Sequence, residues 1–330
     1  MPEHPRTLQS STLGTSGVAP VSLSVVSPVY GCKGCLEELV DRIASAVAPL
    51  GGTFEVILVD DCSPDGAWSR ITELAESRPW LRGLRLSRNF GQHYAIAAGI
   101  EGSRGNVVVV MDCDLQDSPE DIPALVAGLV DTDVVFGQRT ERQDSASKRF
   151  FSWAFFRLLS WLTGVPQDHT TANFGAYSRK VIDVINDMPE RDRCFPLMVK
   201  WTGFSTSYLP VSHATRKEGS SGYSFSKLLR LATEIVLSYS DKPLRLVVKV
   251  GLGFAAIAFG MVAWTLFRFI QGDTQVAGFT SIIASIWLVG GVIISCLGIL
   301  GLYLGRLFID AKRRPYYLVS EQTPEEHRAN

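Results

Sequence analysis

The chain has 330 residues, of which 46% are apolar, 20% charged and 10% aromatic, and its formal net charge at pH 7 is −1. These averages are typical of one or two globular domains and exclude a disordered tail protein, a collagen and a disulfide-dense miniprotein. A near-zero net charge also excludes a general nucleic-acid binder, which carries a strongly basic surface.

The first residues have no apolar core of the kind found in a signal peptide. Residues 1–20 are rich in Ser, Thr, Gly and Pro, and such a segment cannot bury enough apolar surface to fold. We therefore expect residues 1–21 to form a disordered lead and the folded domain to begin at residue 22.

Apolar runs alternate with helical patterns between residues 23 and 136. Strands are predicted at 23–29, 54–59, 81–86, 107–111 and 133–136, and helices at 36–43, 68–74, 94–100 and 122–130. Strands that alternate with helices form a mostly parallel sheet that is covered on both faces. Such sheets bind ligands beyond the carboxyl ends of their strands, so functional residues are expected there.

Six cysteines are scattered along the chain, at positions 32, 35, 62, 113, 194 and 296. Cys32 and Cys35 form a C-x-x-C pair, a spacing shared by redox-active dithiols and by half of a zinc site. No second C-x-x-C or His pair completes a metal set in the sequence. In a reducing cytosol we expect two free thiols at the start of a helix.

Acidic residues follow two of the predicted strands. Asp60 and Asp61 come directly after the second strand, and Asp112 and Asp114 follow the fourth, with Gln116 next. Alternate carboxylates past a buried strand can ligate one divalent cation, and substrate phosphates then fill the remaining positions. Turn formation and helix capping are the alternative roles of a lone D-x-D. The apolar strand before it and the second acidic strand end upstream favour the metal.

A basic and aromatic segment follows the fifth strand. Arg139 lies in the loop expected after that strand, and Lys148 and Arg149 precede a run of aromatic and Leu side chains over 150–161. Arginines in such loops can hold a diphosphate bidentately, and a solvated charged loop is the alternative. The aromatic run predicts a helix in the membrane interface over about 147–163. A buried core helix is the competing interpretation.

Two long uncharged runs lie near the C-terminus, at 250–267 and 278–305. As helices they would span roughly 27 Å and roughly 40 Å, against a hydrocarbon core of about 30 Å. Two adjacent runs of this length disfavour the alternative, a pair of buried core helices. Lys and Arg flank both outer ends, which orients these ends toward the cytoplasm. We expect two transmembrane helices within 246–309, a cytosolic domain over 22–240 and a cytosolic tail over 310–330.

Several segments occur in an order and at a spacing that resemble a known enzyme family. The first are Ser27-Pro28-Val29-Tyr30, Val59-Asp60-Asp61, Arg88-Asn89-Phe90-Gly91, Asp112-Cys113-Asp114-Leu115-Gln116 and Gly137-Gln138-Arg139. They resemble the inverting family 2 glycosyltransferases, specifically the polyprenyl-phosphate glycosyltransferases related to dolichol-phosphate mannose synthase and the bacterial bactoprenol glucosyltransferases. Later segments that resemble the lipid-acceptor half of this family include Arg216-Lys217-Glu218-Gly219 and Ser226-Lys227-Leu228. The resemblance covers about residues 22–318.

The resemblance implies a GT-A fold, which is an α/β architecture with a Rossmann-like, mostly parallel sheet. It also implies interfacial helices at about 147–163 and 225–240 and two C-terminal transmembrane helices. Matched motif by motif, the nucleotide sugar would be bound by Pro28, Tyr30, Asp60, Asp61, Asp112 and Arg139. The metal would be held by Asp112, Asp114 and Gln116, and the acceptor phosphate by Arg149, Arg216 and Lys227. The catalytic residues would be Asp114, Arg139 and Arg216.

Three positions depart from the family pattern. Asn173 stands where many members have an acidic residue, so no general base can be assigned there. Gln92 occupies a place that is often Lys, and Cys113 replaces the usual Ala between the acidic pair. A base is dispensable, because a phosphate monoester has a second pKa of about 6 and is largely an oxyanion near neutral pH.

The expected reaction transfers a hexose or an N-acetylhexosamine from a nucleotide sugar, with UDP the favoured nucleotide, to undecaprenyl phosphate at the cytoplasmic face of the inner membrane. The expected cofactor is a divalent cation, Mg2+ or Mn2+. The expected partners are membrane lipid, further copies of the chain in an oligomer such as a tetramer, a flippase and a transferase that uses the lipid-linked sugar. The alternatives are a non-catalytic membrane scaffold that retains a nucleotide-sugar pocket and a family 2 transferase with a different acceptor.

Overall fold

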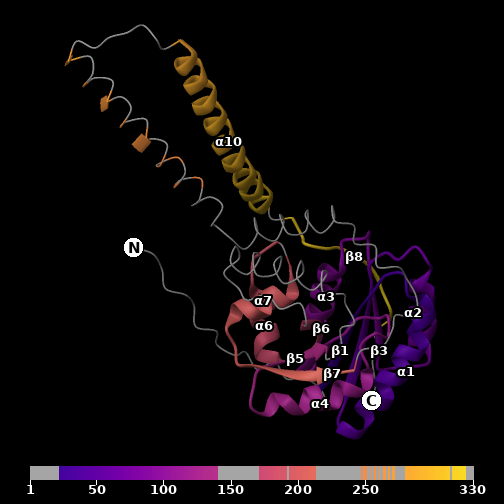
Figure 1. The fold of residues 1–330 in the computed structure, drawn as a ribbon. Coiled ribbons are helices and arrows are strands. Elements are labelled where there is room, and N and C mark those ends of the chain that lie inside the picture. Colours follow the sequence, from indigo (N-terminus) through magenta and orange to yellow (C-terminus); the bar gives the residue numbers. More distant parts are fainter. Residues whose placement is uncertain are drawn as a thin grey trace, which may run out of the picture.

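The computed structural model describes residues 22–139, 171–191, 193–212, separate positions between 247 and 271, 279–312 and 314–324. This part of the chain contains a mixed sheet with helices on both faces and one long helix that stands apart from it (Figure 1). The predicted disordered lead at 1–21 and the predicted interfacial helices at about 147–163 and 225–240 lie outside the described residues.

Eight strands form one sheet in the order β7-β5-β6-β4-β1-β2-β3-β8. Their bounds are Leu23–Val29 (β1), Phe54–Asp60 (β2), Leu81–Leu86 (β3), Val107–Val110 (β4), Val134–Arg139 (β5), Thr171–Ser178 (β6), Thr206–Val211 (β7) and Val319–Gln322 (β8). Parallel pairs join β1 to β2 and β4, β2 to β3, and β5 to β7. Strands β6 and β8 run antiparallel to their neighbours. The predicted α/β architecture with a mostly parallel sheet is confirmed.

Within the described residues, six helices pack on the two faces of this sheet. On one face α1 (Leu36–Val47), α2 (Ala67–Glu76) and α4 (Ile122–Ala127) share a buried cluster. On the other face lie α3 (Gln92–Glu101), α6 (Arg179–Asp187) and α7 (Phe195–Thr202). Adjacent residues of β1 alternate between them, since Val25 belongs to the first cluster and Val26 to the second. Each fully buried aliphatic side chain contributes about 1.5–3 kcal/mol, so both layers hold the sheet.

The fifth strand differs from its prediction. The sequence predicts a strand at 133–136 followed by a loop that carries Arg139, but β5 extends through Arg139, and the predicted loop is wrong. Gln138 pairs with Thr171 of β6 on one side and with Pro210 of β7 on the other. Neighbouring strands on both sides thus extend β5 through residues of low intrinsic strand propensity.

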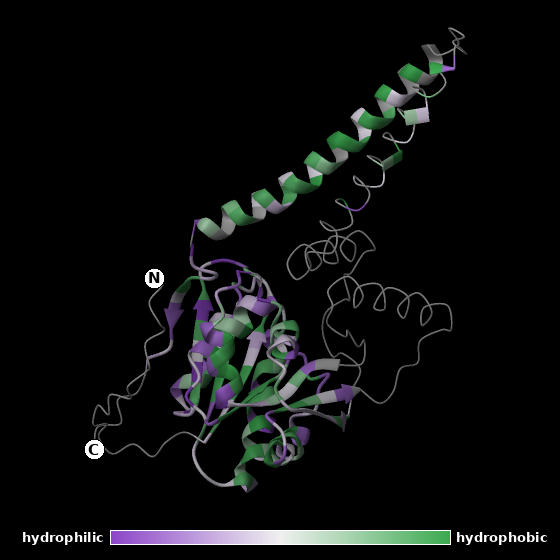
Figure 2. Ribbon diagram, turned by 90° about the vertical axis from the view of Figure 1, so that its left-hand side faces the viewer, coloured by the Kyte–Doolittle hydropathy of each residue, from purple (hydrophilic) through white to green (hydrophobic). Residues whose placement is uncertain are grey.

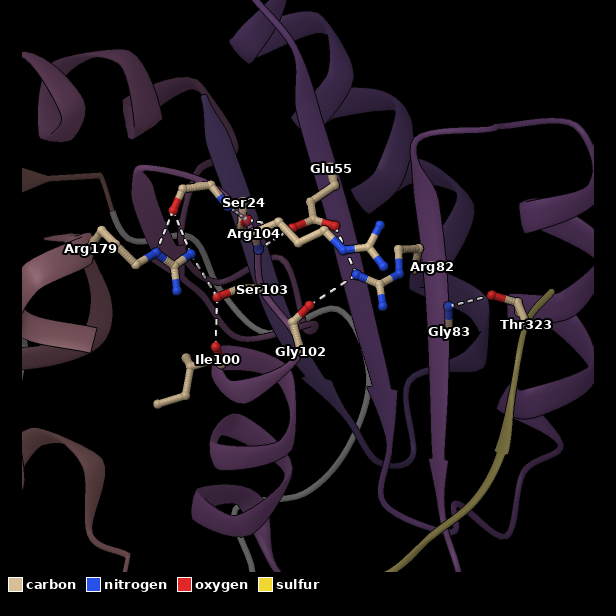
Figure 3. A network of polar contacts seen from close by, with 11 residues as sticks. Ser24, Glu55, Arg82, Gly83, Ile100, Gly102, Ser103, Arg104, Arg179 and Thr323 are labelled. Carbon is tan, nitrogen blue, oxygen red and sulfur yellow. Dashed lines mark hydrogen bonds and ion pairs between the residues drawn. The ribbon is translucent and has the colours of Figure 1, made fainter. Parts of the chain in front are cut away.

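A buried carboxylate ties the amino ends of three strands together (Figure 3). Glu55 is only 4% exposed and accepts hydrogen bonds from the Ser24 hydroxyl (2.7 Å), the Arg82 guanidinium (2.9 Å) and the Arg104 backbone N–H (2.7 Å). Arg82 also donates to the carbonyl oxygen of Gly102 (2.9 Å). Such a satisfied network stabilises a unique arrangement. It braces the edge of the sheet that lies opposite the carboxyl ends of these strands.

Helix α10 (Phe279–Ala311) is the one helix in the described residues that is long and apolar enough to cross a membrane. Its segment Leu288–Gly305 has a mean hydropathy of 2.2, and none of it is buried within the protein. Figure 2 shows hydrophobic residues along the length of the helix. The second predicted span therefore lies in a helix, as expected. Only separate positions of the first, 250–267, are described, and two spans are not established.

Candidate active site

Three neighbouring parallel strands end at the same edge of the sheet. Strands β2 and β4 flank β1 in parallel register, so their carboxyl ends bring Tyr30, Asp60 and Asp112 to this edge. Pro28 is buried in β1, whereas Tyr30, which follows the strand, is 53% exposed. Residues that were predicted for the nucleoside and for the metal thus lie together, at the edge where such sheets bind ligands.

Hydrogen bonds join the loops that follow β1 and β2. The Ser63 hydroxyl accepts from the Gly31 N–H (2.8 Å) and donates to Asp65 Oδ1 (2.6 Å), while Asp65 Oδ2 accepts from the Lys33 N–H (2.9 Å). Burial raises the pKa of Asp65, but hydrogen bonds from Ser63, Lys33 and Ala67 outweigh burial and hold this pKa below its usual value. The two loops therefore form one rigid unit.

Asp61 supports the loop that follows β3. Its carboxylate is 2% exposed and accepts the backbone N–H groups of Phe90 (2.7 Å) and Gly91 (2.8 Å), one on each oxygen. Burial raises the pKa of Asp61 against these two hydrogen bonds and the charge of Arg88. Gly91 has a φ of 107°, which an L side chain rarely adopts. Asp61 thus fixes the shape of the 88–91 loop.

Asp60 is buried and has one carboxylate oxygen without a hydrogen bond. Oδ1 accepts the Ser63 N–H (3.0 Å), whereas Oδ2 has no hydrogen-bond partner and lies 3.6 Å from Nε of Arg85. Burial raises the pKa of Asp60, and the Ser63 hydrogen bond and the Arg85 charge oppose this shift. A buried acceptor without a donor is uncommon in native proteins and calls for an explanation, such as a ligand.

The D-x-D lies in a tight turn after β4. Leu115 has a φ of 59°, a left-handed conformation for a non-glycine residue. This turn brings the Gln116 backbone N–H within 3.1 Å of Asp114 Oδ1. Asp112 Oδ1 accepts a hydrogen bond from Nε2 of Gln92, the first residue of α3, at 2.6 Å. Both carboxylates are therefore held in defined orientations.

The donor atoms of this turn fit a hard divalent cation. Two carboxylates and an amide oxygen, from Asp112, Asp114 and Gln116, are ligand types that Mg2+ and Mn2+ prefer. The described residues contain no group of three or more His, Cys, Asp or Glu side chains that could hold a metal. Protein sites for Mg2+ commonly use one or two carboxylates together with substrate phosphates.

A disulfide joins two of the loops at this edge. Cys32, after β1, is bonded to Cys113, between the two acidic residues, with a Cα–Cα distance of 6.6 Å. The prediction of a free thiol at Cys32 is wrong, because the parallel pairing of β1 with β4 brings together residues 81 positions apart. Cys35 forms no disulfide and is buried at the start of α1, as predicted.

The structure describes some of the remaining predicted residues and not others. Asn173 lies in β6, which runs antiparallel to β4, so it is at the edge where Asp112 follows β4. Arg139 ends β5, and its side chain is outside the described set. The other predicted phosphate-binding residues, Arg149, Arg216 and Lys227, are also outside the described residues.

Two residues that contact the predicted site, Gln92 and Arg85, have no role that the sequence alone predicts. Gln92 was noticeable only as a departure from a family pattern. Arg85 had one signal, a charged residue near the carboxyl end of a predicted buried strand. An arginine there has to find a partner among the neighbouring strand ends.

Comparison with known proteins agrees with this arrangement. The family model described as Glycosyl transferase family 2 matches residues 24–184. An uncharacterized glycosyltransferase of Synechocystis sp. is 31% identical over 307 residues, which cover 91% of this chain and 95% of that protein. The chain belongs to glycosyltransferase family 2. This family 2 chain is also 36% identical to an undecaprenyl-phosphate 4-deoxy-4-formamido-L-arabinose transferase of Pseudomonas aeruginosa, over 91% of this chain and 90% of that protein.

Solved structures resemble the family 2 chain only weakly. A mannosyltransferase from Pyrobaculum calidifontis, in complex with GDP-Man and Mn2+, has 19% sequence identity and a TM-score of 0.45, covering 90% of this chain and 87% of that one. The family membership and the enzyme class, a glycosyltransferase, therefore come from the sequence relatives.

Proposed function

We propose that this enzyme transfers a sugar from a nucleotide sugar, UDP-activated, to undecaprenyl phosphate or a similar polyprenyl phosphate at the cytoplasmic face of the membrane. The sugar is a hexose, an N-acetylhexosamine or 4-deoxy-4-formamido-L-arabinose, which is the sugar in the names of its relatives. The observation that carries the proposal is the identity of 35–36% to several proteins named undecaprenyl-phosphate 4-deoxy-4-formamido-L-arabinose transferase, over about nine tenths of each chain.

The donor nucleoside is proposed to bind at the carboxyl ends of β1 and β2. Exposed Tyr30 offers an aromatic face, and Pro28 shapes the strand end beneath it. The buried Asp60 oxygen that lacks a hydrogen bond is proposed to accept one from an N–H of the base or a hydroxyl of the ribose when the donor binds. Asp61, in this proposal, keeps the 88–91 loop in place around the donor.

The donor diphosphate is proposed to lie at the D-x-D turn. Asp112, Asp114 and Gln116 would hold the divalent cation, which when bound supplies the charge neutralisation that a leaving nucleoside diphosphate needs. Three cationic side chains, Arg139, Arg149 and Arg216, are proposed to screen donor and acceptor phosphates from each other, and Lys227 to bind the acceptor phosphate. Asp114, Arg139 and Arg216 are the residues on which turnover would depend most.

The acceptor needs no protein base in this proposal. A phosphate monoester is largely an oxyanion near neutral pH, so Asn173 at the position of a family carboxylate does not prevent attack. The acceptor oxygen forms a bond to the anomeric carbon while the bond to the nucleoside diphosphate breaks, with the electron pair leaving on the diphosphate. A single in-line displacement inverts the anomeric configuration.

The membrane arrangement extends the proposal. Helix α10 is apolar over Leu288–Gly305, and with the uncharged run at 250–267 it would give two spans within 246–309. Interfacial helices at about 147–163 and 225–240 would hold the 22–240 domain at the inner membrane, with a disordered lead before it and a cytosolic tail at 310–330. The proposed partners are further copies of the chain in an oligomer, a flippase and a transferase that consumes the product.

A donor panel tests the proposed function. The purified full-length chain in nanodiscs receives undecaprenyl phosphate, Mg2+ or Mn2+, and UDP- or GDP-linked hexoses, N-acetylhexosamines or 4-deoxy-4-formamido-L-arabinose, and the glycolipid is identified by mass. We expect one donor to yield a polyprenyl-phosphate sugar, and undecaprenol without phosphate to yield none. Nucleotide binding without transfer would instead support the scaffold alternative. Transfer only to another acceptor would show that polyprenyl phosphate is not the acceptor of this enzyme.

A further inference from the structure

Three charged residues stand in one row across adjacent strands. Asp60 of β2 is in register with Arg85 of β3, and Arg85 is in register with Glu321 of β8. Residues in register on neighbouring strands point to the same face of a sheet. The row therefore begins at the strand end that carries Asp60 and finishes on the strand that follows α10.

The side chains of this row contact one another in sequence. Arg85 Nε lies 3.6 Å from Asp60 Oδ2, the oxygen that has no hydrogen bond, and Arg85 Nη1 lies 2.5 Å from Glu321 Oε1. The second oxygen of Glu321 accepts a hydrogen bond from the indole N–H of Trp68 in α2, at 3.0 Å. Asp60 is fully buried, whereas the Arg85 and Glu321 side chains are 33% and 50% exposed. Glu321 and Trp68 thus hold the guanidinium beside the buried carboxylate.

Hydrogen bonds hold the segment around strand β8 against the domain. Tyr317, just before β8, packs against the core, but all four residues of β8 are exposed, so burial of apolar side chains does not hold the strand itself. Instead the Gly83 N–H donates to the Thr323 hydroxyl (2.9 Å), the Ser87 N–H donates to the Leu318 carbonyl (2.8 Å), and the Tyr316 hydroxyl donates to the Pro189 carbonyl (2.7 Å). The segment after the membrane helix is therefore fastened along the domain from α6 to β3.

We propose that Arg85 and Glu321 are positioning residues of the donor site, through which the strand after the membrane helix keeps the Asp60 carboxylate ionised and oriented toward the nucleoside. The inference rests on the proposed function, because it takes Asp60 as a nucleoside ligand. A nearby cation favours the charged form of a buried carboxylate and limits its rotation. Glu321 in turn prevents the long Arg85 side chain from turning to solvent.

A purely structural role for β8 is the competing explanation, since a short polar strand also covers the open edge of a sheet. The two explanations differ in what Glu321 does. Edge cover depends on the backbone of β8, and replacement of the Glu321 side chain would leave it intact. Gln322 provides a matched control, because the neighbouring residue of a strand points to the opposite face.

The experiment uses the full-length chain in nanodiscs, with four single variants and one double variant. They are Asp60→Asn, Arg85→Gln, Arg85→Lys, Glu321→Gln and the combination of Arg85→Gln with Glu321→Gln, compared with Gln322→Ala. UDP and GDP are the binding probes in calorimetry. The donor identified by the panel is used for KM and kcat, and the thermal midpoint reports on folding.

We expect Glu321→Gln to weaken binding of the nucleoside diphosphate about threefold and Arg85→Gln about tenfold, in the range of exposed and half-buried ion pairs. KM for the donor rises by similar factors, while kcat stays near that of the wild type. The thermal midpoint is unchanged in Glu321→Gln and falls in Arg85→Gln, which leaves the buried Asp60 carboxylate without its cation. The double variant is no weaker than Arg85→Gln alone, because Glu321 acts only through Arg85. Arg85→Lys recovers part of the affinity, and Gln322→Ala binds like the wild type.

Two other results would overturn the inference. In the first, Asp60→Asn binds UDP or GDP weakly, whereas Glu321→Gln and Arg85→Gln bind it like the wild type. Asp60 would then remain a nucleoside ligand, but Arg85 and Glu321 would have no positioning role. In the second, Asp60→Asn binds UDP or GDP like the wild type. Asp60 would then not be a nucleoside ligand, and the inference would fail. Absence of transfer in the donor panel is a separate failure, of the proposed reaction, because UDP and GDP binding still tests the row of charges.

Discussion

Gln92 Nε2 donates a hydrogen bond to Asp112 Oδ1 over 2.6 Å, so the first residue of α3 orients the first carboxylate of the D-x-D. The position of Gln92 is the one that is often Lys in the family that the sequence resembles. A neutral amide holds the carboxylate without neutralising it, whereas a lysine would form an ion pair. Gln92 therefore orients Asp112 without adding a positive charge beside it.

Replacement of Gln92 should weaken the donor site without unfolding the chain. Hydrogen bonds to charged groups contribute about 1.5–3 kcal/mol, and exposure places this one at the low end. Gln92→Leu is therefore expected to raise the half-activating concentration of Mg2+ or Mn2+ and the donor KM by about tenfold. Gln92→Lys should raise the metal requirement further, because its charge competes with the cation. Glu73→Gln, an exposed change on α2, serves as the control, and equal metal titrations for all three variants would contradict the prediction.

Asp114→Asn should remove activity while preserving the turn. An asparagine side-chain oxygen can still accept the Gln116 N–H that Asp114 Oδ1 accepts at 3.1 Å, so only the negative charge is lost. We expect kcat to fall by about 10²–10³ or more, as for other groups that stabilise charge in a transition state, with an unchanged thermal midpoint. Asp131→Asn, on the exposed surface, provides the comparison. Wild-type turnover of Asp114→Asn with bound metal would exclude Asp114 from the mechanism.

The sequence identified the strand ends because local signals agree there. Leu81–Leu86 and Leu23–Val29 have the bounds that their apolar runs predict, and the acidic residues after β2 and β4 follow from the same runs. In contrast, β6 (Thr171–Ser178) contains Asn, Gly and Ser and shows no clear strand period. It is a strand because β4 and β5 pair with it on both sides, which no local pattern contains.

The sequence also does not predict the long-range contacts at the candidate site. The partners Arg85 and Glu321 are 236 residues apart, and Cys32 and Cys113 are 81 apart. Both pairs follow from the order in which strands lie in the sheet, with β4 beside β1 and β8 beside β3. Strand order depends on tertiary packing rather than on local propensity. A sequence can therefore predict which edge of the sheet is the candidate ligand site better than it predicts the contacts that organise this edge.

The disulfide predicts a redox-dependent stability. Closing a loop of this length stabilises a fold by about 2–4 kcal/mol in typical cases. Under non-reducing conditions Cys113→Ser should lower the free energy of unfolding by that amount, and a dithiol reductant should destabilise the wild type but not the variant. Thiol titration of the denatured chain should detect four thiols before reduction, those of the cysteines outside the disulfide, Cys35, Cys62, Cys194 and Cys296. Six free thiols in the oxidised protein would contradict the Cys32–Cys113 bond.

Acid sensitivity should arise from His93, at the start of α3. Burial lowers its pKa to about 4 from an ordinary value of 6.5, Nδ1 has no hydrogen-bond partner, and Nε2 lies 3.8 Å from Cys194 Sγ. The unfolded chain therefore binds a proton on His93 at a higher pH than the folded chain does. Stability is fully present above about pH 6.5 and falls as the pH drops toward 4, by at most about 3 kcal/mol at 1.36 kcal/mol per pKa unit.

His93→Gln isolates this contribution, because glutamine has no proton to gain. Other groups, including the buried Asp60 and Asp61, titrate in both proteins and cancel in the difference between them. We expect the difference in unfolding free energy between wild type and variant to be constant above pH 7 and to shift steadily against the wild type between pH 6.5 and pH 4.5. Denaturant unfolding of the full-length chain at several pH values measures it. Parallel stability curves across that range would show that His93 is not held neutral by burial.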